Sequence, residues 1–225
     1  MESKLFTPVT FGPLTLRNRT IRSAAFESMC PGNAPSDMLL NYHRSVAAGG
    51  IGMTTVAYAA VTRSGLSFDR QLWMRPEIIP GLRRLTDAVH AEGAAAGIQL
   101  GHCGNMSHKS ICGCTPVGAS GGFNLYSPTF VRGLRADELP ELARAYGRSV
   151  NLAREAGFDA VEIHAGHGYL ISQFLSPATN HRKDEFGGSL QNRMRFMDMV
   201  LEEVMKAAGN DMAVLVKMNI CLLYT

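Results

Sequence analysis

The chain has 225 residues and a formal charge of +3, with 46% apolar and 18% charged residues. This is the composition of a globular protein, because a disordered chain has fewer apolar residues and more net charge. A domain of this size buries enough surface to fold without a disulfide or a structural metal. The sequence has no block of Lys and Arg that could follow a phosphate backbone, which argues against nucleic acid as a partner.

The sequence also argues against secretion and against a membrane span. Residues 1–8 lack the apolar core and the cleavage site of a signal peptide. The uncharged stretch 45–62 is broken by glycines at 49, 50 and 52, so we interpret it as a helix end, a turn and a buried strand. Five cysteines, an odd number, indicate reduced thiols. We therefore expect a cytoplasmic protein with no membrane partner.

Short apolar runs alternate with amphipathic runs along the chain. In chain order they predict a strand over 20–25, a helix over 36–48, a strand over 51–57, a helix over 80–92, a strand over 95–100, a helix over 137–156, a strand over 160–164, a helix over 189–208 and a strand over 213–218. Glycines follow the predicted helices, at 49, 93, 157 and 209, where they are typical C-terminal residues.

Repeated strand–helix units predict a parallel sheet with right-handed crossovers. Two architectures satisfy this pattern, an open doubly wound sheet and a (β/α)8 barrel. No G-x-G-x-x-G follows the first strand, which weakens the dinucleotide-binding version of the open sheet. Polar residues at the strand C-termini favour the barrel modestly, because barrel enzymes place their chemistry there. They are Gln99, His102, His164, His167 and Lys217.

Only about five strand–helix units can be counted, whereas a closed barrel has eight and takes about 250 residues. We therefore expect an incomplete (β/α)8 TIM barrel that forms a single domain over 1–225 and is truncated on its C-terminal side. The strand over 213–218 would then be an edge without a partner.

The segment 161–170 is the richest in groups that could carry chemistry. His164 and His167 are three residues apart, and Tyr169 follows two residues later. Each can donate a hydrogen bond, and donors at the mouth of a dry pocket can polarise a carbonyl group. From spacing alone, polar loop residues that cap a strand explain the pattern equally well. We expect no metal site, because His-x-x-His lacks the helical i, i+4 spacing and a third ligand.

Two further polar residues end apolar strands. The amide of Gln99 must form hydrogen bonds, either with a flat heterocycle or with backbone groups. Lys217 needs an anionic partner, which a cofactor phosphate, an electron-rich ring or a neighbouring carboxylate could supply. The loop cysteines Cys103, Cys112 and Cys114 have no C-x-x-C spacing, so free thiols are favoured over a metal site.

Several motifs together resemble one family. They are Gly157-Phe158-Asp159-Ala160-Val161-Glu162-Ile163-His164, His167-Gly168-Tyr169-Leu170, Gln173-Phe174-Leu175-Ser176-Pro177, Asn180-His181-Arg182, Asp184-Glu185-Phe186-Gly187-Gly188-Ser189 and Asn192-Arg193-Met194-Arg195-Phe196, with Leu16-Arg17-Asn18-Arg19 and Gln99-Leu100-Gly101-His102-Cys103-Gly104 upstream. This set resembles the old yellow enzyme family of FMN-dependent ene-reductases (NADH:flavin oxidoreductases). The resemblance covers about residues 5–219.

The resemblance implies a (β/α)8 barrel with an N-terminal hairpin closing its bottom and FMN at its C-terminal mouth. By position, the residues implied to contact the flavin are Ser23, Ala24, Ala25 and Phe26, the backbone N–H of Tyr58, the Gln99 amide at the pyrimidine edge and the Lys217 cation on the N1 side. His164 and His167 match the pair that binds the substrate carbonyl oxygen, and Tyr169 matches the proton donor.

The implied activity is transfer of a hydride from NADH or NADPH, through FMN, to the activated C=C bond of an α,β-unsaturated carbonyl compound. The chain departs from the family pattern in having His/His where other members have His/Asn. Asn105 and Phe26 also differ from the residues that other members have at these positions. The family continues through strands whose loops hold the FMN phosphate, so we expect FMN binding by this chain to be weak or absent. A flavin-free barrel isomerase or lyase and an inactive fragment remain alternatives, and a homo-oligomer stays open.

Overall fold

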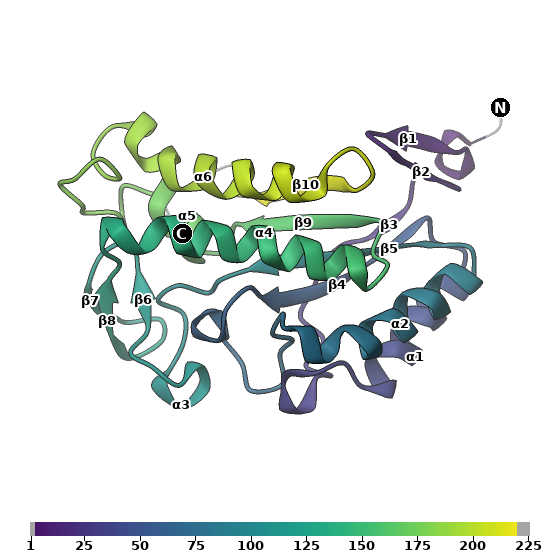
Figure 1. The fold of residues 1–225 in the computed structure, drawn as a ribbon, viewed down its shortest axis with the longest axis horizontal. Coiled ribbons are helices and arrows are strands. Elements are labelled where there is room, and N and C mark those ends of the chain that lie inside the picture. The colour runs from purple at the N-terminus through teal and green to yellow at the C-terminus, as the bar shows by residue number, and fades with distance from the viewer. Residues whose placement is uncertain (1–2, 220–225) are drawn as a thin grey trace.

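A five-stranded parallel sheet forms the centre of the computed structural model, which describes residues 3–219 (Figure 1). The spatial order is β10-β9-β5-β4-β3, and every neighbouring pair is parallel. The strands are β3 (Ile21–Arg22), β4 (Met53–Ala60), β5 (Ala95–Gly101), β9 (Ala160–Ala165) and β10 (Ala213–Met218). The predicted alternation of strands and helices is confirmed.

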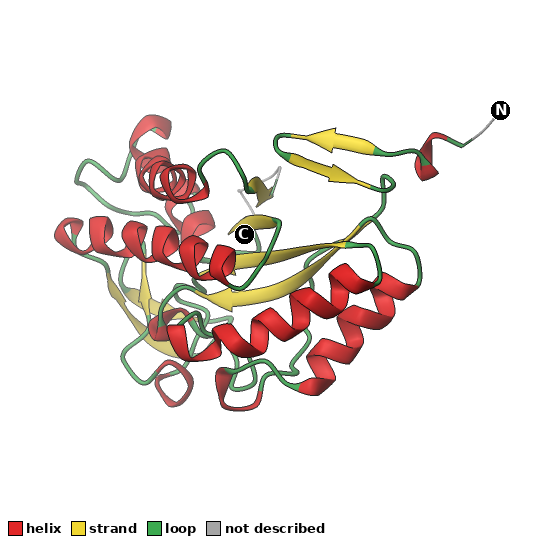
Figure 2. Cartoon of the chain, turned by 45° about the vertical axis from the view of Figure 1, so that its right-hand side comes forward, coloured by secondary structure: helices red, strands yellow, loops and turns green. Residues whose placement is uncertain are grey.

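Four helices connect these strands and lie on one side of the sheet (Figures 1 and 2). They are α1 (Asp37–Ala48), α2 (Ile79–Ala91), α4 (Leu139–Glu155) and α6 (Leu190–Ala208). The hydroxyls of Ser36 and Ser189 cap α1 and α6, accepting from the N–H groups of Leu39 and Asn192. Short 3-10 turns lie at Lys4–Phe6, Pro31–Asn33, Arg63–Gly65, Pro76–Ile78 and Ala136–Glu138.

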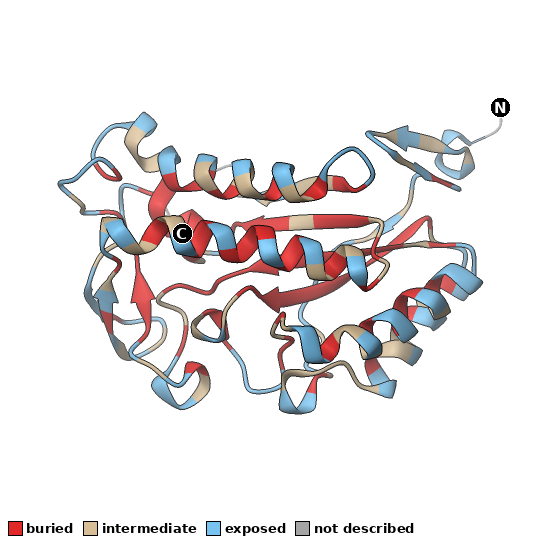
Figure 3. Cartoon of the chain, in the orientation of Figure 1, coloured by how far each residue is buried: buried red, intermediate tan, exposed pale blue. Residues whose placement is uncertain are grey.

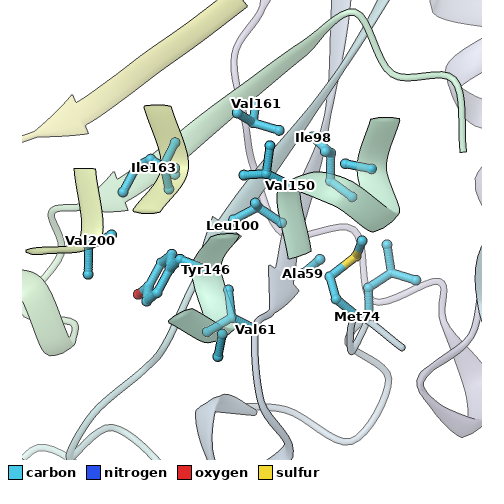
Figure 4. Packing of buried hydrophobic residues seen from close by; sticks show 14 of the residues in the cluster. Ala59, Val61, Met74, Ile98, Leu100, Tyr146, Val150, Val161, Ile163 and Val200 are labelled. Carbon is cyan, nitrogen blue, oxygen red and sulfur yellow. The ribbon is translucent and has the colours of Figure 1, made fainter. Parts of the chain in front are cut away.

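The core lies between the sheet and the helices, where the buried residues form a continuous layer (Figure 3). Strand residues with outward-facing side chains pack against helix residues in this layer. Figure 4 shows this packing for Ile98, Leu100, Val161 and Ile163 against Tyr146, Val150 and Val200. Because side chains alternate along a strand, the residues between them point to the inner side of the sheet. This alternation places Gln99, Glu162, His164 and Lys217 on the inner side.

An antiparallel hairpin, β1 (Val9–Phe11) and β2 (Leu14–Leu16), closes the N-terminal end of the sheet. Leu16 is 1% exposed and packs with Met53, Ala160 and Ala213, which start or precede three of the strands. The Arg17 guanidinium donates to the carbonyl oxygens of Ala47, Ile51 and Glu92, beyond or at the ends of α1 and α2. The expected hairpin at the bottom of the barrel is therefore present.

The structure differs from the sequence prediction in the first strand and in two long loops. β3 has only two residues, because the chain leaves the sheet at Ser23. The loops that follow β5 and β9 hold α3 (Lys109–Cys112), β6 (Val117–Gly118), β7 (Gly122–Asn124), β8 (Thr129–Gly133) and α5 (Leu170–Leu175). The three strands form a small sheet of their own, which lies at the C-terminal end of the main sheet in Figure 1.

The main sheet is strongly curled. β3 and β10 are its two opposite edges, yet Lys217 of β10 donates to the Ala24 carbonyl at 2.9 Å and to the Ser23 hydroxyl at 3.2 Å. A curled parallel sheet with all its helices outside is the arrangement of part of a (β/α)8 barrel, as predicted. Within residues 3–219, no helix is both long and apolar enough to cross a membrane.

Candidate active site

The predicted site residues converge at one end of the sheet, because the carboxyl ends of parallel strands share one edge. They follow or end β3, β4, β5, β9 and β10. His102 also follows β5, but its ring packs over Gly65 and bonds to the Ser64 hydroxyl, so it lines a different cavity. The site therefore draws on all five strands.

His164 lies at the end of β9 and is 3% exposed. Its Nδ1 accepts from the Gly166 N–H at 3.3 Å, and its Nε2 lies 3.2 Å from His167 Nδ1. Burial lowers the pKa of His164 to about 3, assisted by His167 and by the Lys217 cation. The imidazole is therefore neutral at pH 7. Because Nδ1 accepts, the proton is assigned to Nε2, and this N–H points at His167.

His167 holds an unusual backbone conformation. Its φ is 56°, in the left-handed region that non-glycine residues seldom adopt. Its N–H donates to Asn219 Oδ1 at 3.0 Å. A Cβ atom at Gly166 would lie 2.5 Å from the same oxygen, so this close approach requires glycine there. Asn219 thus clamps the loop that carries the second imidazole.

Tyr169 completes the donor group. Its ring centroid lies 4.8 Å from that of His164 and 5.3 Å from that of Tyr58. The Tyr169 oxygen accepts from the Ser67 hydroxyl at 3.3 Å, and the Tyr58 hydroxyl donates to the Gly65 carbonyl at 3.1 Å. Burial raises the pKa of Tyr169, so the phenol keeps its proton at neutral pH. Because its oxygen accepts from Ser67, that proton is left for another acceptor.

For each of Gln99 and Lys217, the structure removes one of the alternatives that the sequence left open. The Gln99 amide nitrogen donates to Glu162 Oε1 at 2.6 Å, rather than to backbone, and no residue within 3–219 donates to its carbonyl oxygen. Lys217 bonds only to the neutral oxygens of Ser23 and Ala24, and within the described part of the chain it forms no ion pair with a carboxylate. A cation without a counter-charge can accept a negatively charged ligand.

The mouth suits the ring of the FMN that the resemblance implies. Phe26 stacks on Phe68 with ring centroids 4.5 Å apart, although the two side chains are 38% and 45% exposed. The pairing of β4 with β5 skips Ala57 and Tyr58, so the backbone there stands outside the regular ladder. An exposed aromatic stack, an irregular backbone segment and the unpaired Lys217 cation are what a flat, electron-rich heterocycle would need around it.

Glu27 is a structural residue of this mouth that sequence reasoning missed. Its carboxylate is 3% exposed, and it accepts from Arg22 Nη1 at 2.6 Å and from the Ala57 N–H at 3.2 Å. His43 Nε2 lies 3.3 Å away. Glu27 therefore joins the segment after β3 to the irregular part of β4. The only sequence signal is a pair of opposite charges flanking residues 23–26.

A cavity of about 520 Å³ opens beside His167. It lies between the loop after β9 and the small sheet, and its lining includes Asn105, Phe123, Tyr126, Gly168, Thr179 and His181. Pockets for small organic molecules commonly have this volume and a mainly apolar lining. The cavity therefore has room for a small organic molecule next to His167.

Comparison with known proteins identifies relatives of this chain. The chain is 44% identical over 215 residues to a 4,4'-dithiodibutanoate disulfide reductase of Rhodococcus erythropolis, covering 96% of this chain and 53% of that protein. It is 37% identical over 209 residues to an NADPH dehydrogenase of Bacillus subtilis (strain 168), covering 91% and 60%. The chain thus spans somewhat over half the length of these relatives.

Solved structures agree with the sequence relatives. An old yellow enzyme homologue from Zymomonas mobilis superposes with a TM-score of 0.87 at 30% identity, covering 95% of this chain and 63% of that one. Morphinone reductase in complex with tetrahydroNAD gives a TM-score of 0.87 at 28% identity, covering 96% and 64%. The family model for NADH:flavin oxidoreductases and NADH oxidases matches residues 4–223, and the chain belongs to this family, whose cofactors are FMN and NAD(P)H.

Proposed function

We propose that this chain carries the hydride-transfer site of an FMN-dependent reductase that acts on the activated C=C bond of α,β-unsaturated carbonyl compounds. The observation that carries the proposal is the meeting of three hydrogen-bond donors, His164, His167 and Tyr169, at the mouth that also holds the unpaired Lys217 cation. Because the chain spans only part of its relatives, the activity of the whole protein is part of the proposal.

The cofactor would be held by the ring-side residues. Lys217 and the Gln99 carbonyl oxygen would meet the polar edge of the flavin, and the segment 23–26 would lie along it. The chemistry that FMN supplies when bound is the storage and delivery of a hydride taken from NADH or NADPH. Glu27 would keep the segment after β3 and the Ala57–Tyr58 backbone at fixed positions on either side of the ring.

The two histidines would bind the carbonyl oxygen of the substrate. His164 is neutral and presents its Nε2–H, which now points at His167 Nδ1 at 3.2 Å. A substrate oxygen that enters between the rings would take over this N–H. It would receive a second one from His167 once the His167 proton has moved from Nε2 to Nδ1, the atom that now accepts from His164. Two donors aimed at one oxygen stabilise the negative charge that develops there as the β-carbon is reduced.

Tyr169 would supply the proton for the α-carbon. Its pKa is raised by burial, so it remains a phenol at neutral pH, and its oxygen already accepts from Ser67. An acid that donates in the transition state typically contributes 10²–10⁴-fold, as a rough range. Ser67, whose hydroxyl already donates to this oxygen, would then stabilise the negative charge left on it.

A disulfide is the second candidate substrate. The relative from Rhodococcus erythropolis, 44% identical to this chain, is named for reduction of 4,4'-dithiodibutanoate. Both substrate classes accept a hydride equivalent, but only the carbonyl compound needs two donors on one oxygen and a proton at carbon.

The four described cysteines are free thiols, which is consistent with the cytoplasmic location that we propose.

The decisive experiment uses the 225-residue chain with excess FMN under anaerobic conditions. Oxidation of NADH or NADPH is followed with 2-cyclohexen-1-one or with 4,4'-dithiodibutanoate as acceptor, and the products are identified. With FMN in excess we expect formation of cyclohexanone, whereas the flavin absorption band should weaken or disappear when unbound FMN is removed, because this chain is expected to hold FMN weakly. A protein with bound flavin that reduces only the disulfide would contradict the enone proposal. A protein that takes up no flavin would favour the isomerase, lyase or inactive alternatives.

A further inference from the structure

Two thiols face each other on a turn that the flavin site does not use. Cys112 is the last residue of α3, Cys114 follows two residues later, and their sulfur atoms are 3.9 Å apart. Gly113 between them has a φ of 77°, which reverses the chain and turns both side chains toward one another. A disulfide requires about 2.05 Å between the sulfur atoms, so the two side chains must rotate and bring these atoms closer before the bond can form.

We propose that Cys112 and Cys114 form a reversible dithiol–disulfide pair that exchanges with small organic disulfides, independently of the flavin. In the first step a thiolate of the pair attacks a disulfide RSSR, forms a mixed disulfide and releases RS⁻. In the second step the other cysteine, having lost its proton, attacks the protein sulfur of that mixed disulfide and releases the second RS⁻. Two protein thiols are oxidised, and one RSSR is reduced to two RSH.

The surroundings assign different tasks to the two cysteines. Cys114 is partly exposed and lines a cavity of about 730 Å³, with Arg132 and His102 among its neighbours there. Cys112 is 2% exposed, and its sulfur contacts the carbonyl oxygens of His108 and Cys114. An external disulfide can therefore reach Cys114 from the cavity, and Cys112 is placed to resolve the mixed disulfide from inside.

Two arginines lie close to this turn. The guanidinium carbon of Arg63 lies 3.3 Å from the place that a Cβ at Gly113 would occupy. Arg63 and Arg132 lower the pKa of Cys114, but burial and the neighbouring Cys112 outweigh them and raise it overall. Little thiolate is then present at neutral pH, so exchange will be slow, and an equilibrium measurement is a better test than a rate.

A third thiol, Cys103, is the main competitor for either partner. It is fully buried, its sulfur contacts the Leu66 carbonyl at 3.4 Å, and burial raises its pKa to about 12. These features predict that Cys103 stays reduced while the pair exchanges. Tryptic digestion can show whether the pair or Cys103 has reacted. Trypsin cleaves after Lys109 and Arg132, and leaves Cys112 and Cys114 on one peptide and Cys103 on another.

The test equilibrates the whole chain with oxidised and reduced glutathione, without FMN or nicotinamide. After acid quenching, alkylation and digestion, we expect the peptide 110–132 to carry an internal disulfide, lighter by two hydrogens than its dithiol form. The peptide that holds Cys103 should remain alkylated. The same equilibrium in denaturing guanidinium chloride gives the reference, and the folded chain should form the disulfide at least about tenfold more favourably, since the fold holds the thiols together.

Single variants sharpen the assignment. Cys112→Ser should leave Cys114 as a stable mixed disulfide with glutathione, Cys114→Ser should leave Cys112 largely unreacted, and Cys103→Ser should behave like the parent chain. The proposal is overturned if peptide 110–132 stays fully alkylated, if it is cross-linked to Cys103, or if folding brings no advantage over the denatured chain. None of these results depends on the flavin, so failure here and failure of the proposed reductase activity are distinguishable.

Discussion

The two ends of the same sheet have opposite character. At the N-terminal end, Leu16 of the hairpin packs with Met53, Ala160 and Ala213, and the contacts are apolar and closed. At the C-terminal end, Gln99, His164 and Lys217 lie near the carboxyl ends of β5, β9 and β10, are polar, and are surrounded by loops. The difference shows that strand direction determines which end of a parallel sheet can carry a functional site. Short connections pack the N-terminal end, whereas the carboxyl ends are free of them.

The largest effect should come from removing both imidazoles at the C-terminal end. In FMN-loaded protein, His164→Ala with His167→Ala should reduce enone reduction by roughly 10²–10³-fold or more and should abolish phenol binding, because an oxygen loses its donors. Steady-state kcat/KM and a phenol titration measure both. His90→Ala, a histidine paired with Asp159 near the N-terminal end, is the matched control and should keep its activity. Unchanged phenol affinity in the double variant would refute the assignment.

Substitutions at the N-terminal end of the sheet should change the stability of the fold and leave the catalytic rate unchanged. Leu16→Ala leaves a cavity among buried apolar side chains, so the free energy of unfolding should fall by about 3 kcal/mol. Thr15→Ala, on the exposed face of the same strand, should change it by less than about 0.5 kcal/mol. Denaturant unfolding measures both variants. A Leu16 variant with normal stability, or one whose remaining folded protein has lost its catalytic rate, would contradict the assignment of stability to one end of the sheet and catalysis to the other.

A single group within the C-terminal end can be tested next. Tyr169→Phe should slow enone reduction by roughly 10²-fold and leave reduction of bound flavin by nicotinamide nearly unchanged, because the proton is needed only in the second half-reaction. Stopped-flow measurement of the two half-reactions separates them. Equal slowing of both halves would indicate a structural role for the phenol.

The smallest effect is a change in pH dependence. The pKa of His164 falls from 6.5 to about 3 on folding, through burial, His167 and Lys217. Between these values the unfolded chain binds more protons, so stability decreases as the pH falls, by up to about 1.4 kcal/mol per pH unit. In His164→Asn the loss of stability between pH 7 and pH 5 should shrink by about 2 kcal/mol. Identical pH profiles of parent and variant would contradict the buried, neutral imidazole.

The regular elements could be predicted from sequence, because periodicity and end signals are local. The helix predicted over 189–208 is observed as α6 (Leu190–Ala208), and the glycine at 209 marks its end. The small sheet could not be predicted, since its strands are two to five residues long and contain several glycines. Residues that hold the site in place were missed for another reason. Glu27 and Ala57 are 30 residues apart, and Ser67 and Tyr169 are 102 apart, so nothing local marks them as neighbours.

The contact of Lys217 with Ser23 and Ala24 also bears on how the chain folds. These partners are separated by 194 and 193 residues, so bringing them together closes a loop of nearly the whole chain. Such a contact has a high entropic cost, and contacts of this kind form late, after the local strand–helix units have assembled. During synthesis the ring-side pocket would stay open until β10 has left the ribosome. Any flavin contact that needs both β3 and β10 must therefore wait until β10 has formed.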